Sequence, residues 1–89
     1  MNDYDQYLQE FVYEKLWSEL SFVEKNIIKN FPEYEIATKD LIAKSKIDNS
    51  YFSIYRERLI KKGLIFSPSY GKVKLSLPRF YNFIKTKII

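Results

Sequence analysis

The hydrophobic period of the chain changes at Gly63, and this change constrains the fold more than any other feature. Over residues 50–62 the apolar side chains recur every three or four positions, as on one face of an amphipathic helix. Over residues 72–77 they alternate with polar ones, as on a strand with one buried face. Because glycine suits the left-handed position that follows a helix, the sequence predicts a helix that ends at Gly63 and passes directly into β-structure. The inward face of this helix is expected to carry Phe52, Tyr55, Leu59 and Ile60.

A β-hairpin is predicted to follow this helix. Its strands fall within residues 64–67 and 72–77, and the "PSYG" segment between them supplies Pro68 and Gly71 for a turn. Pro78 then ends the second strand, because proline lacks the amide hydrogen that a sheet requires. The buried face of that strand is expected to carry Val73, Leu75 and Leu77, and the wet face Lys72, Lys74 and Ser76.

A shorter helix is predicted before the long one. In "TKDLIAKS" Thr38 is expected to be the N-cap, with Leu41 and Ile42 facing inward. The following "KIDNS" segment forms a turn, and its last three residues are all able to cap the next helix. A short helix, a tight turn and a longer helix together are the signature of a helix-turn-helix.

Further elements are predicted on both sides. An amphipathic helix over about residues 3–17 either packs on the domain or joins it to something upstream. "SFVE" at residues 21–24 has the spacing of a capping box, and the helix it starts ends before Pro32. A short strand is expected over residues 34–37 and a last helix within residues 79–89. The apolar positions of these helices are Tyr4, Tyr7, Leu8, Phe11, Val12 and Leu16; then Phe22, Val23, Ile27, Ile28 and Phe31; then Phe80, Phe83, Ile84 and Ile88.

Taken in order, these elements predict a mainly α fold with a small β-hairpin wing. The pattern is that of a winged helix-turn-helix with extra N- and C-terminal helices, forming a single domain over residues 1–89. Within it, residues 1–18 are expected to pack on the domain or link to it. The recognition helix is expected at about 50–62 and the wing at about 64–77.

The charges of the chain are segregated. Residues 1–37 contain eight acidic residues and three lysines, a net charge of −5. Residues 38–89 contain twelve basic and three acidic residues, a net charge of +9. A basic half of this kind favours a polyanionic partner through a long-range field that salt weakens. The alternative is an ordinary solvated lysine surface, as expected for Lys85 and Lys87.

Several kinds of chemistry are excluded by composition. The chain has no histidine and no cysteine, so imidazole catalysis, thiolate chemistry and the common zinc ligand sets are absent. Its two glycines cannot form a phosphate-binding loop of the G-x-x-x-x-G-K-[ST] type. We therefore expect a protein that is not an enzyme and needs no metal or cofactor. No apolar run could span a bilayer and the N-terminal segment is acidic, so a cytoplasmic location without membrane contact is expected.

DNA is the partner that this pattern favours. In a winged helix the recognition helix enters the major groove while the wing and the preceding helix contact the backbone. Serines near the start of the helix could donate hydrogen bonds to phosphate, and the arginine could contact guanine or phosphate. The predicted contacts are Ser50, Tyr51, Ser53, Ile54, Arg58 and Lys61 on the helix, Lys39, Lys44 and Lys46 on the preceding helix and turn, and Tyr70, Lys72 and Lys74 on the wing.

A second interpretation of the same helix stays open. Tyr51 and Ile54 together suit a protein interface, or an intramolecular regulatory contact, as well as DNA. Glu57 lies next to the predicted contact face and would repel phosphate unless Lys61, four residues later, neutralises it. Arg56 is expected to be half-buried and to form a salt bridge within the helix, so Arg58 is the preferred contact.

A family resemblance rests on the segment "IDNSYFSIYRERLIKKGLI" followed by "YGKVKLSLPRF". It resembles the C-terminal winged-helix domain of bacterial and archaeal AAA-type ATPases of the origin-recognition-like group. Those domains share a tyrosine-arginine pair, an "RLI..GLI" step, a wing that contains glycine and an "LPRF"-like end. The resemblance covers about residues 16–84 and is most specific over residues 51–80. It implies a prokaryotic protein with an ATPase domain upstream in the same chain, to which this domain is a DNA- or partner-binding appendage.

Overall fold

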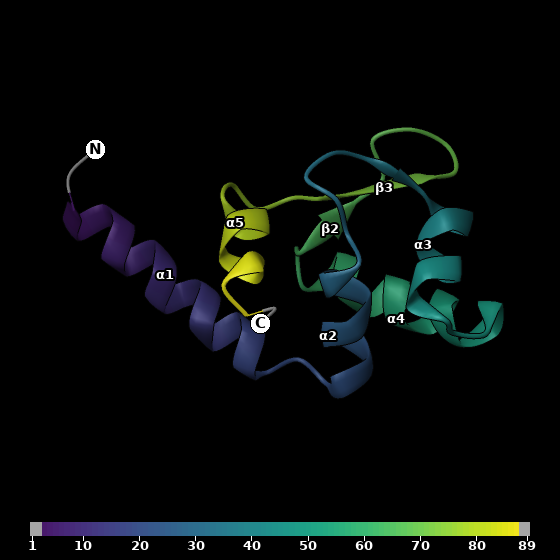
Figure 1. Cartoon of the computed structure of the whole chain (residues 1–89), viewed down its shortest axis with the longest axis horizontal. Coiled ribbons are helices and arrows are strands. Elements are labelled where there is room, and N and C mark those ends of the chain that lie inside the picture. The colour runs from purple at the N-terminus through teal and green to yellow at the C-terminus, as the bar shows by residue number, and fades with distance from the viewer. Residues whose placement is uncertain (1–2, 88–89) are drawn as a thin grey trace.

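The computed structural model describes residues 3–87, with side chains from Leu8 onward. The described chain is mainly helical, with a small three-stranded antiparallel sheet (Figure 1). This confirms the predicted combination of helices with a small β-hairpin. In chain order the elements are α1 (Asp3–Ser18), α2 (Phe22–Lys29), β1 (Ile36–Ala37), α3 (Thr38–Ser45), α4 (Asn49–Lys61), β2 (Ile65–Phe66), β3 (Lys72–Leu75) and α5 (Phe80–Lys85).

Strand β3 lies in the middle of the sheet, between β1 and β2. Ile36 of β1 is opposite Val73, and Ile65 of β2 is opposite Leu75. These four side chains are buried, which confirms the prediction for Val73 and Leu75, whereas Leu77 is only half-buried. The strand predicted over residues 34–37 is present as the two residues of β1. It adds a third strand to the hairpin.

Local capping sets the bounds of α4. The Asp48 carboxylate accepts a hydrogen bond from the Ser50 amide at 2.9 Å and caps the N-terminus. At the other end Gly63 has φ = 76°, the left-handed conformation that ends helices. Phe52 and Leu59 are buried, so the inward face is the predicted one.

The capping box predicted for α2 is present. The Ser21 hydroxyl accepts from the Glu24 amide at 3.2 Å, and the Glu24 carboxylate accepts from the Ser21 amide at 2.9 Å. Glu24 is only 3% exposed, and its carboxylate pairs with the Lys62 ammonium group just after α4. The prediction that Phe22 packs inward is wrong. At the first position of α2 its side chain faces solvent and is 87% exposed.

The prediction that Thr38 caps α3 is also wrong. The N-cap is Ala37, which has no side chain able to accept a hydrogen bond. The Thr38 amide donates to the Gly71 carbonyl at 2.8 Å, so the hairpin loop satisfies one of the amides that have no acceptor within the helix. This bond joins the start of α3 to the hairpin.

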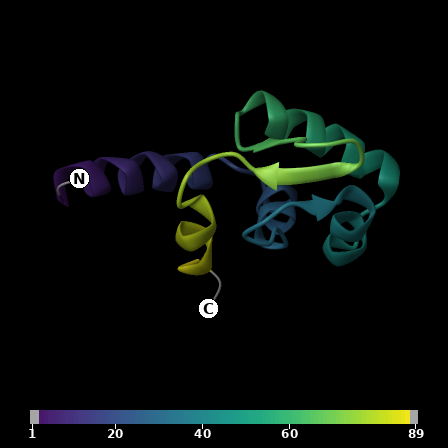
Figure 2. The same ribbon diagram turned by 90° about the horizontal axis from the view of Figure 1, so that it is seen from above.

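Helix α1 packs only in part through the predicted face: Leu16 is half-buried against the core, but the other predicted positions that are described are not. Tyr13, Trp17 and Leu20 are buried, whereas Leu8, Phe11 and Val12 are exposed. Tyr4 and Tyr7 lie outside the residues whose side chains are described. The N-terminal part of α1 extends away from the rest of the fold, as Figure 2 shows.

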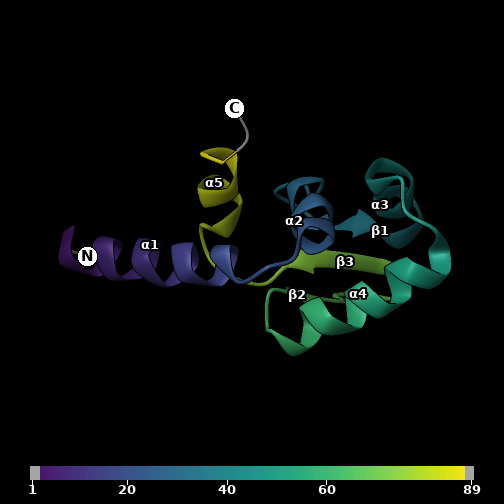
Figure 3. The same cartoon turned by 90° about the horizontal axis from the view of Figure 1, so that it is seen from below.

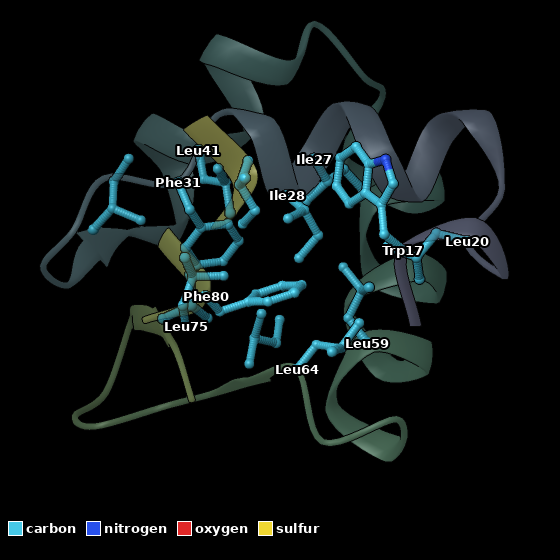
Figure 4. Close-up of a cluster of buried hydrophobic side chains, with 14 of the residues drawn as sticks. Trp17, Leu20, Ile27, Ile28, Phe31, Leu41, Leu59, Leu64, Leu75 and Phe80 are labelled. Atoms are coloured by element: carbon cyan, nitrogen blue, oxygen red, sulfur yellow. The ribbon is translucent and has the colours of Figure 1, made fainter. Parts of the chain in front are cut away.

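Helix α5 joins α1 to the core. The Tyr13 hydroxyl donates to the Pro78 carbonyl at 2.6 Å, and its ring meets the Phe80 ring edge-on at 5.1 Å. The expectation of a solvated tail is wrong for Lys87, whose ammonium group lies 2.7 Å from the Glu14 carboxylate. Ile88, predicted to pack inward, lies outside the described residues. Figure 4 shows the core that these contacts border, including Trp17, Leu20, Ile27, Ile28, Phe31, Leu41, Leu59, Leu64, Leu75 and Phe80.

Candidate nucleic-acid interface

Helix α4 begins at the end of the molecule farthest from the N-terminus of α1 and runs back toward the middle (Figure 3). Lys46 between α3 and α4 has φ = 57°, a left-handed conformation that redirects the chain within the short connection. Tyr51 is 62% exposed and Ile54 is 51% exposed. The other residues predicted to contact DNA from this helix are also exposed: Ser50, Ser53, Arg58 and Lys61.

Part of this face is a shallow hollow. Its lining combines Ser53, Ile54, Arg58 and Lys61 with Glu57. Glu57 therefore lies within the predicted contact face and not beside it. Among the described residues neither Glu57 nor Lys61 forms an ion pair, so Lys61 does not neutralise Glu57. The hollow carries two cationic groups, one carboxylate and an apolar centre.

The two serines predicted to donate to phosphate already donate within the helix. The Ser50 hydroxyl bonds the Asp48 carboxylate at 2.8 Å, and the Ser53 hydroxyl bonds the Asn49 carbonyl at 3.1 Å. A hydroxyl has a single hydrogen to donate. Either serine would have to break its present bond to donate to a phosphate.

Asp48 adds a second negative charge at this end of α4. Hydrogen bonds from the Ser50 amide, and then from its hydroxyl, hold the pKa of Asp48 below its usual value. The carboxylate stays ionised at neutral pH and occupies the helix N-terminus. An approaching phosphate would be repelled there, which further weakens the case for Ser50 as a contact.

Arg58 remains the best placed cation. Its guanidinium group lies 5.3 Å from the centre of the Tyr55 ring, an arrangement that orients it over the helix surface. Tyr55 itself is half-buried against the core, as predicted. Because a guanidinium group has five N–H donors, Arg58 keeps donors for an anion while it stacks on the ring.

The hairpin loop forms the second part of the interface. Tyr70 at its tip is fully exposed, and Gly71 next to it has φ = 75°. The Ser67 hydroxyl lies 2.8 Å from the carbonyl oxygens of both Ser69 and Lys72, so its single hydrogen bonds one of them or is shared between them and ties the loop together. The loop is therefore short and internally bonded.

A second hollow lies between α3, α4 and this loop. Tyr70 and Ser53 line it, together with Arg56 and Asn49, which were not among the predicted contacts. Arg56 is half-buried as expected, but it makes no ion pair with any residue that the structure describes. Its helical register with Asn49 and Ser53 is the signal that could have placed it beside the wing.

The two wing lysines lie apart from these hollows. The Lys72 ammonium group is 3.8 Å from the Glu35 carboxylate, and both side chains are about half exposed. Lys74 is half-buried and lines a hollow with Glu33 and Phe66 on the other side of the hairpin. Lys72 is therefore paired with an acidic residue, and Lys74 shares its hollow with both Glu33 and Arg79.

The lysines in and just after α3 are exposed but lie outside the two hollows. Lys39 lies in the first turn of α3, Lys44 in its last turn and Lys46 just after it. None of them lines either hollow. They can contact only a ligand large enough to extend beyond the α4 face.

No group of three His, Cys, Asp or Glu residues that could hold a metal ion occurs in the part of the chain that the structure describes. In the same part of the chain, no helix has the length and apolar character required to cross a membrane.

Comparison with models of protein families assigns the chain to a family. A family model described as "Domain of unknown function (DUF8462)" matches residues 10–84. The chain belongs to this family. No curated protein and no solved structure matches it. The matched segment begins within α1 and ends within α5, so the family model includes α3, α4 and the hairpin loop.

Proposed function

We propose that this domain is a winged helix-turn-helix that binds DNA. In this proposal α3 and α4 are the helix-turn-helix, α4 is the recognition helix and the β2–β3 hairpin is the wing. The observation that supports it best is the pair Arg58 and Lys61, exposed on the outward face of α4 without an ion-pair partner among the described residues. Free cations on the outer face of the second helix are what a phosphate backbone requires.

The proposed contacts differ from those predicted from the sequence in that Arg56 is added and the lysines of α3 and the wing have a weaker role. Arg58 and Lys61 bind phosphate or a guanine edge, and Arg56 binds the backbone between α4 and the wing. Tyr70 at the loop tip contacts the adjacent minor groove or sugar. Lys39, Lys46, Lys72 and Lys74 add long-range attraction rather than fixed contacts, and Tyr51 and Ile54 pack on the backbone or on thymine methyl groups.

Fluorescence anisotropy with a mixed-sequence duplex at several salt concentrations tests the proposal. If about six phosphates are neutralised, the logarithm of affinity should fall with the logarithm of salt with a slope of about −5. The Arg58→Ala/Lys61→Ala variant should bind more weakly and reduce that slope by about 2. Lys15→Ala/Lys85→Ala is the matched control, since it removes the same charge from exposed positions on α1 and α5. Equal loss in both variants, or no binding at low salt, would refute the proposal.

A protein-binding module is the second candidate. It is favoured by the exposure of Tyr51 and Ile54 and by the serine hydroxyls that already donate within α4. An interface centred on these apolar side chains would be much less sensitive to salt than DNA binding. Tyr51→Ala and Ile54→Ala would then abolish partner binding, whereas the Arg58/Lys61 pair would matter less.

The resemblance to origin-recognition-like ATPases adds an ATPase domain upstream in the same chain, in the cytoplasm of a prokaryote. This part of the proposal rests on the sequence segments "IDNSYFSIYRERLIKKGLI" and "YGKVKLSLPRF". The parent open reading frame is its test. A segment of the form G-x-x-x-x-G-K-[ST] upstream would support it, and a free-standing gene would oppose it.

A further inference from the structure

The hollow between α3, α4 and the hairpin loop differs in charge from the hollow around Ile54. Arg56 is the one charged residue among the described residues that line it, whereas Glu57 belongs to the lining of the other hollow. Asp48 precedes Asn49 in the chain but is not part of this lining. A phosphate group that enters the hollow beside the loop therefore meets a cation and no lining carboxylate.

The same hollow combines an aromatic ring with hydrogen-bonding groups. Tyr70 stands at the loop tip and is fully exposed, so the fold covers neither face of its ring. Across the hollow, Asn49 and Ser53 lie on α4 in helical register with Arg56, and the Asn49 side chain is exposed. A side-chain amide can both donate to and accept from the edge of a base. The lining thus offers a separate contact for each part of a nucleotide.

The exposed ring of Tyr70 requires a partner with an accessible flat face. Within a continuous duplex the base pairs stack on one another, and only their edges are open in the grooves. An unpaired nucleotide exposes the faces of its base, and aromatic side chains stack on such bases with little regard for sequence. The ring of Tyr70 therefore fits an unpaired base better than a paired one.

The hollow beside the loop adjoins the hollow on the outward face of α4. Ser53 lines both of them, so the two hollows meet at this residue. A strand that lies along Arg58 and Lys61 can therefore continue past Ser53 toward Arg56 and Tyr70.

We propose that the domain binds DNA at a junction between a duplex and a single strand. The outward face of α4 holds the duplex, and the first unpaired nucleotide enters the hollow beside the loop. There Tyr70 stacks on its base, Arg56 pairs with its phosphate and Asn49 hydrogen-bonds the edge of the base. On a continuous duplex the same ring reaches only a groove or a sugar. The inference rests on the proposed function, since α4 must bind duplex DNA.

Fluorescence anisotropy with a pair of matched DNAs tests this proposal. One is a blunt duplex, and the other is the same duplex with a short unpaired tail on one strand, in either polarity. The wild-type protein should bind the tailed DNA about tenfold more tightly, as expected for one stacked base. Because stacking releases no counterions, this ratio should persist when salt is raised. A preference due only to the added phosphates should shrink instead.

Variants separate the two parts of the site. Tyr70→Ala should reduce the ratio to about one, and Tyr70→Trp should keep it, because an indole ring also stacks. Arg58→Ala/Lys61→Ala should weaken binding to both DNAs and keep the ratio. Tyr34→Ala is the matched control and should change neither affinity nor ratio, since Tyr34 is an exposed tyrosine outside both hollows.

A fluorescent base analogue at the first unpaired position reports the stacking directly. The wild-type protein should quench it, and Tyr70→Ala should not. Equal affinity for the two DNAs, or a preference that Tyr70→Ala retains, overturns this proposal and leaves duplex binding by α4 in place. So does a single strand alone that binds as tightly as the tailed duplex. Absence of binding to any of these DNAs would overturn the proposed function as well.

Discussion

The Lys62 ammonium group lies 2.8 Å from the carboxylate of Glu24, across 38 positions of sequence. The carboxylate is buried in the first turn of α2, and the lysine immediately follows α4. This ion pair therefore fixes the C-terminal end of α4 against α2. Because its ammonium group is paired, Lys62 is not free to bind DNA, although it is the sequence neighbour of Lys61.

Removal of this lysine should destabilise the fold. Lys62→Ala leaves the buried Glu24 carboxylate without its cation, at a loss of about 1–3 kcal/mol in the free energy of unfolding. The loss falls short of that for a fully buried pair because the Lys62 side chain is partly exposed and water can reach it. Urea denaturation measures the change. Lys61→Ala, its neighbour without an ion pair, should alter stability by less than about 0.5 kcal/mol.

Stability should also fall in acid through Glu24. Burial would raise the pKa of this carboxyl, but hydrogen bonds from Lys62 and Ser21 outweigh burial and hold it below its ordinary value of 4.5. Because the folded pKa is lower than the unfolded one, the unfolded chain binds more protons as pH falls below the ordinary value. The stabilisation is thus complete above that value and is lost as pH falls through the folded pKa. Thermal denaturation from pH 7 to pH 3 should show a flatter profile for Glu24→Gln than for the wild-type protein.

Neutralisation of Glu57 should strengthen DNA binding. Its carboxylate lies in the same hollow as Arg58 and Lys61, where it repels phosphate. Removing one such charge near the surface changes binding by about 1 kcal/mol, so Glu57→Gln should raise affinity roughly fivefold at low salt. Anisotropy titrations measure this, and Glu19→Gln on α1 is the control with the same charge change. An affinity gain shared by both variants would mean that only net charge matters, and a loss in Glu57→Gln would mean that the carboxylate contacts a base.

The two faces of α1 should differ sharply in their effect on stability. Trp17 is buried beneath the ammonium groups of Lys25 and Lys29, so Trp17→Ala should cost about 3–5 kcal/mol. Phe11 is exposed, so Phe11→Ala should change the monomer by less than about 0.5 kcal/mol. Urea denaturation at a dilute protein concentration compares them. A larger loss for Phe11→Ala than for Trp17→Ala would show that α1 packs through the other stripe.

Features set by neighbours in sequence were the predictable ones. The Ser21–Glu24 capping box, the Asp48 cap and the left-handed Gly63 all involve residues within four positions of each other. The inward face of α4 was equally clear, because polar residues separate its apolar positions. The mainly helical fold with a small antiparallel sheet followed from these local signals.

Features set by distant contacts were not predictable. Helix α1 has two apolar stripes, and only the position of α5 decides that Tyr13 and Trp17 pack while Phe11 does not. The absence of a cap on α3 depends on the Gly71 carbonyl, 33 positions from Thr38, and Lys72 is drawn to Glu35 across the sheet. In the candidate site, the type of residue likewise does not reveal which acceptors the serine hydroxyls use or which charged groups form ion pairs. Both depend on which side chains are neighbours in the folded structure.

The hydrogen bond from the Thr38 amide to the Gly71 carbonyl has a mechanical consequence for any ligand of the α4 face. Together with the pairing of β1 and β3, it makes the hairpin loop and the start of α3 move as one body. The backbone that carries Tyr70 is therefore joined to the start of α3, which sets the spacing between the loop tip and the two helices before anything binds. A ligand that touches both must match that spacing, and it gains affinity without first having to order the loop.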